Sequence, residues 1–231
     1  MTLSTMERSR RMTKKEVHAH IRRVGIVPSV RLPSYDMGEF AAETLFAAGI
    51  PVVEIAMEMP RALDLIQAIE TSYPEIAVGA CGVLNEEFAR CAIDAGASFI
   101  ACPGIVPKVI AYGASAGILT VPGAFTPTEI IAAWEAGSDL IRIFPIAAAG
   151  GANYLRAVCS SLPQISLMVA GGVNHLTAFE LVVAGADAIG IAGELLPAEA
   201  IHFRDSSRIH ALARKFLSLV NDARASRAIY Y

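Results

Sequence analysis

Short apolar runs alternate with longer segments of mixed polarity along almost the whole chain. Five of the runs follow a small residue and a glycine, and these glycines are Gly49, Gly96, Gly117, Gly137 and Gly185. Glycine is favoured just after a helix because it enters the left-handed conformation without steric cost. Three further runs open at Gly25, Pro74 and Pro163. The eight positions are 20 to 26 residues apart, which predicts eight units of strand, turn and helix.

The segments between the runs predict the helices. We expect them at about 36–48, 60–72, 85–95, 106–115, 127–136, 151–161, 175–184 and 208–223. Asn85, Thr126 and Asn174 stand where a side-chain oxygen can cap a first turn. Eight alternating strands and helices predict an α/β fold of the (β/α)₈ TIM-barrel type. A doubly wound open sheet is the alternative, and the even period without a switch point disfavours it.

The composition narrows the class of protein. Of 231 residues, 54% are hydrophobic and 18% charged, the formal net charge is -3, and the mean hydropathy is +0.49. These values exclude a disordered chain and a nucleic-acid-binding surface of basic residues. The longest uncharged stretches, 109–128 and 157–179, contain glycines and prolines that a membrane helix would have to compensate. We therefore expect buried parallel strands, with no membrane and no nucleic acid as partner.

The N-terminal segment differs from the rest. Residues 1–23 hold seven Lys or Arg and two Glu, so they carry +5 and the remainder carries -8. We expect residues 1–24 to form a basic arm with a short helix at about 14–23, and residues 25–231 to form one barrel domain. The segment lacks the apolar core of a signal peptide. Four cysteines without a CxxC spacing indicate reduced thiols and a cytoplasmic protein.

Two charged residues interrupt strands that are otherwise apolar, at positions where TIM barrels carry their chemistry. Glu54 lies within VVEIAM and Arg142 within LIRIF. A buried carboxylate is costly unless it is paired or used, so Glu54 is a candidate general acid or base. Arg142 stays protonated, so it can hold an anion but cannot act as a nucleophile. The structural alternative is an ion pair between the two across the barrel.

Glycine-rich turns follow the seventh and eighth strands, where this fold repeatedly binds phosphate. Gly171 and Gly172 leave the seventh strand, and Ala192 and Gly193 leave the eighth. We expect these four residues to bind phosphate, with a helix-like start at Glu194. Tight packing between helix and strand is the structural alternative.

A metal site is a weaker hypothesis. Glu58, Cys81 and Cys102 end neighbouring strands and could converge on a soft metal. Such cysteines more often act as small buried apolar residues, and we expect no metal and no cofactor. None of the five histidines ends a strand. His175, just after the turn at Gly172, is the nearest, and we expect it to face solvent.

The strand-end motifs, taken in order, resemble the 2-keto-3-deoxy-6-phosphogluconate (KDPG) and 4-hydroxy-2-oxoglutarate (KHG) aldolase family. The resemblance implies a homotrimeric, class I aldolase-like (β/α)₈ barrel that cleaves a phosphorylated 2-keto-3-deoxy acid to pyruvate and a triose phosphate. The matching segments are IVPSVRL (26–32), AGIPVVEIAMEMPRALDLI (48–66), VGACGVLN (78–85), FIACPG (99–104), VPGAFTPTE (121–129), IRIFPIAAAGG (141–151), AGGVN (170–174) and IAGELLP (191–197).

The resemblance also implies roles for individual residues. Glu54 matches the general acid or base. The expected substrate-binding residues are Arg31, Glu58, Gly82, Pro103 and Phe144. The family forms its Schiff base on a lysine in a segment resembling F-K-F-F-P, and Arg142 stands at that position here. Glu58 replaces an arginine or neutral polar residue, Gly82 a threonine, and Gly193 a serine that helps to hold phosphate.

Arginine cannot form the iminium intermediate, and the four lysines, Lys14, Lys15, Lys108 and Lys215, lie outside the predicted strands. Three functions stay open. The first is a lyase acting on a small 2-keto acid or sugar-acid phosphate, with Glu54 moving a proton and Arg142 stabilising negative charge. The second is a non-catalytic homologue that binds an anion. The third is a different phosphate-binding barrel enzyme, an isomerase or decarboxylase using Glu54.

Overall fold

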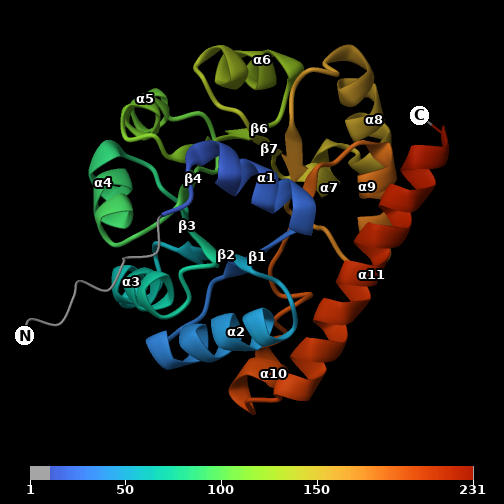
Figure 1. The fold of residues 1–231 in the computed structure, drawn as a ribbon. Helices are drawn as coiled ribbons and strands as arrows, with labels where there is room; N and C mark the ends of the chain where they lie inside the picture. Colours follow the sequence, from blue (N-terminus) through green and yellow to red (C-terminus); the bar gives the residue numbers. More distant parts are fainter. Residues whose placement is uncertain (1–10, 231) are drawn as a thin grey trace, which may run out of the picture.

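The computed structural model describes residues 11–230, so residues 1–10 of the expected basic arm lie outside this range. Parallel strands form a ring that helices surround (Figure 1), so the predicted TIM barrel is confirmed. The strands are β1 (Ile26–Val30), β2 (Val52–Ala56), β3 (Ala77–Cys81), β4 (Phe99–Ala101), β5 (Leu119–Val121), β6 (Gly123–Ala124), β7 (Ile141–Ile143), β8 (Leu167–Val169) and β9 (Ala188–Ile191).

The fifth predicted strand is split in two at Pro122. The strands pair in the order β5-β4-β3-β2-β1-β9-β8-β7-β6, so both ends of this order belong to one stretch of chain. Val121 accepts a hydrogen bond from Cys102 N at 3.1 Å on one side, and Pro122 accepts one from Arg142 N at 2.9 Å on the other. Proline has no N–H to donate to a ladder. Each half of the strand therefore pairs with one neighbour, and together they close the barrel.

The helices follow the predicted series with three corrections. The helix expected at 175–184 begins at Ala178, and the last helix extends further than 208–223. Two short helices, α7 and α10, were not expected. The helices after β1 are α2 (Tyr35–Ala47), α3 (Ala62–Ser72), α4 (Glu86–Asp94), α5 (Pro107–Ser115), α6 (Pro127–Glu135), α7 (Ile146–Ala149), α8 (Gly151–Ser161), α9 (Ala178–Ala184), α10 (Ala198–His202) and α11 (Ser206–Tyr230).

Local signals in the sequence explain where these elements begin and end. Asn85 Oδ1 accepts from Phe88 N at 2.8 Å, and Thr126 forms a capping box with Glu129, so two of the predicted caps are confirmed. Asn174 instead holds the turn before α9, because its Oδ1 accepts from the N–H groups of Leu176 and Thr177. The glycines predicted to follow helices all have positive φ, namely Gly49, Gly96, Gly117, Gly137 and Gly185.

Helix α1 (Lys14–Val24) lies across the end of the barrel where the strands begin (Figure 1). Its Val17 and Ile21 are fully buried, because the helix presents one apolar face to the strands. Arg224 on α11 holds the end of α1, donating to Arg23 O at 2.7 Å. Helix α1 therefore covers the ends of the strands on this side of the barrel. No helix within residues 11–230 combines the length and hydropathy needed to cross a bilayer.

Candidate active site

A cavity of about 690 Å³ lies at the carboxyl ends of the strands. We call it the mouth cavity. All residues that the sequence predicts to act in catalysis, phosphate binding or substrate binding line this cavity, with the exception of Glu58. Glu58 instead forms an ion pair with Arg31, which does line the cavity. The lining residues are Ser29, Arg31, Glu54, Cys81, Gly82, Cys102, Pro103, Arg142, Phe144, Ala170, Gly171, Gly172, Val173, Gly190, Ala192, Gly193 and Glu194.

Glu54 and Arg142 form an ion pair at the floor of the mouth cavity. Arg142 Nη2 donates to Glu54 Oε2, and Ser29 Oγ donates to Glu54 Oε1 at 2.5 Å. Ser29 reaches the carboxylate because it is the register partner of Glu54 on the neighbouring strand β1. The Glu54 and Arg142 side chains are only 1% and 9% exposed. The ion pair considered from the sequence is therefore present, and both Glu54 oxygens are engaged.

Arg142 keeps unused hydrogen-bonding capacity beside the cavity. Burial alone would lower its pKa, but the charge and hydrogen bond of Glu54 outweigh burial, so the pKa is raised and the guanidinium stays charged. Its Nη2 also lies 3.8 Å from Met168 Sδ. The buried Nε has no hydrogen-bond partner among the described residues. An orphaned buried donor is costly, so this guanidinium is suited to hold one more acceptor.

A second ion pair lies at the rim, between Arg31 and Glu58. Their side chains are 57% and 48% exposed, so water screens this pair far more than the buried one. A Cβ at Gly82 would lie 3.1 Å from Glu58 Oε2, so the glycine leaves room for that carboxylate. The arginine expected to attract a substrate anion is therefore partly neutralised by its neighbour.

The two glycine turns approach the mouth cavity from β8 and β9. Gly171 and Gly172 have φ of +84° and +85°, and a Cβ on Gly172 would lie 2.4 Å from Ala147 Cβ. At Gly193, by contrast, an added Cβ would meet open space. The N–H groups of Gly172 and Gly193 donate to no other described residue. Around Glu194, where a helix-like start was expected, the chain makes a single turn in which Leu195 N and Leu196 N donate to Ala192 O. The regular helix α10 begins only at Ala198.

Cys81, Cys102 and Glu58, the three residues of the metal hypothesis, do not gather as metal ligands would. Burial raises the pKa of Cys102 to about 12, and burial together with the Glu54 charge raises the pKa of Cys81 further. Both thiols therefore favour the neutral form in this apolar surrounding. Glu58 is paired with Arg31 instead. Within residues 11–230, no three His, Cys, Asp or Glu side chains gather as metal ligands would.

None of the four lysines lines the mouth cavity in the part of the chain that the structure describes. Lys14 lies at the opposite end of the barrel, where it pairs with Asp139 at 2.8 Å. Lys108 is exposed in the first turn of α5, and Lys15 and Lys215 are also exposed on helices.

Ser29 was missed from the sequence, and Glu194 and His175 were noted there without a role in the site. Ser29 lies within an apolar run, and only the strand register places it beside Glu54. Glu194 lines the cavity, and its Oε2 lies 3.6 Å from His175 Nδ1, so His175 stands at the rim with its side chain 44% exposed. The spacing of charged residues after β8 and β9 could have indicated this pair.

Comparison with known proteins now identifies the class. The family model for KDPG and KHG aldolase matches residues 17–212. The chain is also 30% identical over 201 residues to the 2-dehydro-3-deoxy-phosphogluconate aldolase of Treponema pallidum, covering 87% of this chain and 95% of the relative. The chain belongs to the KDPG and KHG aldolase family.

Solved structures share this fold, and one of them is a named KDPG aldolase. A KDPG aldolase from Legionella pneumophila, with pyruvate captured at low pH as a covalent carbinolamine intermediate, has a TM-score of 0.79 and 26% identity. The alignment covers 85% of this chain and 96% of that one. A cube-shaped protein cage designed by fusing symmetric oligomeric domains has a TM-score of 0.82 and 25% identity, over 90% of this chain and 76% of the cage chain.

Proposed function

We propose that this protein is a retro-aldol lyase that cleaves a 4-hydroxy-2-keto acid to pyruvate and an aldehyde without a covalent lysine intermediate. The observation that carries the proposal is the buried pair of Glu54 and Arg142 beneath a cavity at the carboxyl ends of the strands. Family membership supports the reaction class. The Arg142 guanidinium, which cannot form a Schiff base, supports an electrostatic route.

The chemistry follows from these two groups. Glu54 accepts the proton of the substrate C4 hydroxyl, which takes the place of Ser29 Oγ at Glu54 Oε1. The C3–C4 bond then breaks, the C4 fragment leaves as the aldehyde, and the electron pair moves toward the C2 carbonyl to form the enolate of pyruvate. The free donors of Arg142 stabilise the enolate oxygen, and Glu54 returns its proton to C3. Atoms and charge balance, and Glu54 ends as it began.

The remaining site residues position the substrate in this proposal. Arg31 binds the substrate anion, Glu58 and Gly82 shape the pocket around it, and Pro103 and Phe144 form apolar contacts. The turns at Gly171, Gly172, Ala192 and Gly193 bind a phosphate group through backbone N–H groups, which is supported by the donors left free at Gly172 and Gly193. A substrate of this kind is a 2-keto acid that carries a phosphate at its far end.

The test combines turnover with covalent trapping. We expect the wild-type protein to release pyruvate from KDPG or KHG, measured through lactate dehydrogenase, and to gain no mass when treated with pyruvate and borohydride. The Glu54→Gln variant should lose turnover. The Arg142→Lys variant places an amine at the family's position and should form a borohydride-stable adduct. An adduct on the wild-type protein would contradict the noncovalent route.

A non-catalytic anion-binding protein is the second candidate, and one observation favours it. Both Glu54 oxygens are already occupied, by Arg142 and Ser29. If this network does not open, keto acids and sugar phosphates should raise the melting temperature while no pyruvate is released. Turnover that Glu54→Gln abolishes would exclude this candidate.

We further propose that the chain assembles as a homotrimer. The symmetric oligomeric domains of the related cage support self-association. Ile131 and Trp134 support it as well, since they are three residues apart on one face of α6 and remain 37% and 45% exposed. Light scattering should give three times the chain mass, and Trp134→Lys should reduce it. A monomeric wild-type protein would refute the assembly.

A further inference from the structure

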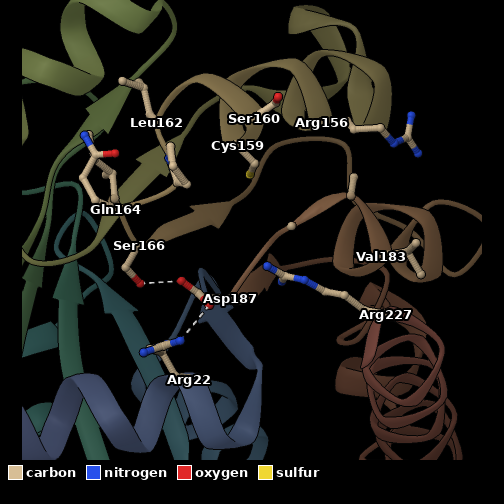
Figure 2. A pocket seen from close by; sticks show the side chains of 14 residues that line it. Arg22, Arg156, Cys159, Ser160, Leu162, Gln164, Ser166, Val183, Asp187 and Arg227 are labelled. Atoms are coloured by element: carbon tan, nitrogen blue, oxygen red, sulfur yellow. Dashed lines mark hydrogen bonds and ion pairs between the residues drawn. The ribbon is translucent and has the colours of Figure 1, made fainter. Parts of the chain in front are cut away.

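A second cavity, of about 740 Å³, lies at the end of the barrel opposite the mouth cavity. We call it the basal cavity. It is enclosed by α1, the ends of α8 and α9, the segment leading into β8, and the last turns of α11 (Figure 2). The positively charged side chains that line it are Arg22, Arg156 and Arg227, and Asp187 is the one carboxylate among its lining residues. The charges of these four residues sum to +2, although the whole chain carries -3.

The carboxylate of the basal cavity is already engaged. Asp187 Oδ2 accepts from Ser166 Oγ at 2.5 Å, and Oδ1 lies 3.3 Å from Arg22 Nη2. Arg156 donates to the neutral Asn153 side chain at 3.1 Å. Arg227 forms no hydrogen bond or ion pair with the residues that the structure describes. Two guanidinium charges at a concave surface therefore lack a counter-charge, an arrangement that raises the local concentration of anions.

The position of Arg227 is fixed by its neighbour on the same helix. Arg224, one turn earlier, donates to the backbone oxygens of Arg23 at 2.7 Å and Asp187 at 3.1 Å. This anchor holds α11 against α1 and brings Arg227 over the basal cavity, and Figure 2 shows Arg22 and Arg227 approaching Asp187 from α1 and α11. The family match ends at residue 212. The part of α11 that carries Arg224 and Arg227 thus lies beyond the family match, whereas Arg22 lies within it.

The geometry points to a binding site for a phosphomonoester in the basal cavity, separate from the proposed reaction. The phosphate group lies between Arg227, which has no counter-charge among the described residues, and Arg22, which contacts Asp187 through Nη2. The planar fork of a guanidinium binds phosphate oxygens in pairs. A dianionic phosphate equals the +2 charge of the wall in magnitude. Leu162, Pro163 and Val183, which also line the cavity, provide an apolar surface for the carbon part of the ligand.

The first experiment measures the affinity for glycerol 3-phosphate by calorimetry. Glycerol, which has no charge, tests whether the anion is needed, and glutarate, which has two carboxylates, tests whether a phosphate group is needed. We expect the Arg227→Gln and Arg22→Gln variants each to weaken the basal binding event about 10- to 100-fold, the range for loss of a charge-assisted hydrogen bond. Arg214→Gln is the matched control, because Arg214 is exposed on the same helix and does not line the cavity. Wild-type affinity in both site variants would overturn the proposal, as would equal affinity for glutarate.

The second experiment reports the location of binding independently of the mouth cavity. Cys159 lines the basal cavity and is partly exposed, whereas Cys91, also partly exposed, does not line it. Saturating glycerol 3-phosphate should slow alkylation of Cys159, followed by peptide mass spectrometry, and leave Cys91 unchanged. Unchanged labelling of Cys159 would place the ligand elsewhere and refute the basal site. Neither readout depends on turnover, so a failure here leaves the proposed lyase reaction untouched.

Discussion

Removing one partner of the Glu54–Arg142 pair should destabilise the protein far more than replacing both. The two side chains are 1% and 9% exposed, so an Arg142→Met change leaves the Glu54 charge without its buried partner. Breaking a buried pair in this way costs about 3–5 kcal/mol. For a chain of this length each kcal/mol lowers the melting temperature by about 2–4 °C, so we expect a loss of about 6–20 °C. The double variant Glu54→Leu/Arg142→Met should be more stable than either single variant, because no buried charge remains.

The rim pair provides the matched control for this experiment. Arg31 and Glu58 face the same cavity region, but their side chains are about half exposed, and exposed pairs contribute only about 0–1 kcal/mol. Arg31→Met should therefore change the free energy of unfolding by less than about 1 kcal/mol. Urea unfolding followed by circular dichroism measures all five proteins. Equal losses for Arg142→Met and Arg31→Met, or strictly additive losses in the double variant, would refute the assignment of a buried, coupled pair.

Three further measurements examine other parts of the molecule. Burial lowers the pKa of His18 and of His20 from the ordinary 6.5, so the unfolded chain binds protons more readily than the folded one. The free energy of unfolding, measured with urea, should therefore fall as the pH drops below about 6.5. Replacing both histidines with Gln should flatten this pH dependence. Burial raises the pKa of Cys81 and Cys102, so a thiol reagent at pH 8 should modify Cys91 in the folded protein well before these two, and equal rates would contradict their burial. Gly193→Ser should fold normally and bind phosphate compounds more tightly, because a Cβ at Gly193 meets open space. Gly172→Ala should lower the melting temperature, because Gly172 has a positive φ and its added Cβ would meet Ala147. Equal melting temperatures for the two variants would contradict the described turns.

The period of the sequence was sufficient to predict the barrel, because each unit repeats the same local signals. Glycines such as Gly49 and Gly185 mark the left-handed residue after a helix, and Asn85 and Thr126 cap the helices that follow. Irregular features that extend over only a few residues were not predicted, because they leave no repeating pattern in the sequence. Pro122 divides a strand, and the four-residue helix α7 is too short to show a helical period.

The membership of the site could be predicted, and the Glu54–Arg142 ion pair was one of the alternatives, but two other contacts were not foreseen. Strand ends meet at one end of a parallel barrel, which brought Glu54, Gly172 and Arg142 into one cavity. Which groups touch depends on strand register and on distances across the barrel. The contact of Ser29 with Glu54 follows from register, and the neutralisation of Arg31 by Glu58 depends on two flexible side chains. Neither is encoded in the spacing of residues.

The split strand at Pro122 has a consequence for how this barrel resists aggregation. A sheet exposes N–H and C=O groups along its outer strands, and those groups can recruit other chains. Here the two outer strands of the pairing order are β5 and β6, joined through Pro122, so the chain hides its edges by connecting them to each other. A Cβ at Gly123 would lie 2.1 Å from Pro103 O, and Gly123→Ala should therefore spread this junction. Opening there would expose both edges at once, and amide hydrogen exchange at residues 119–124 would detect it before the rest of the barrel unfolds.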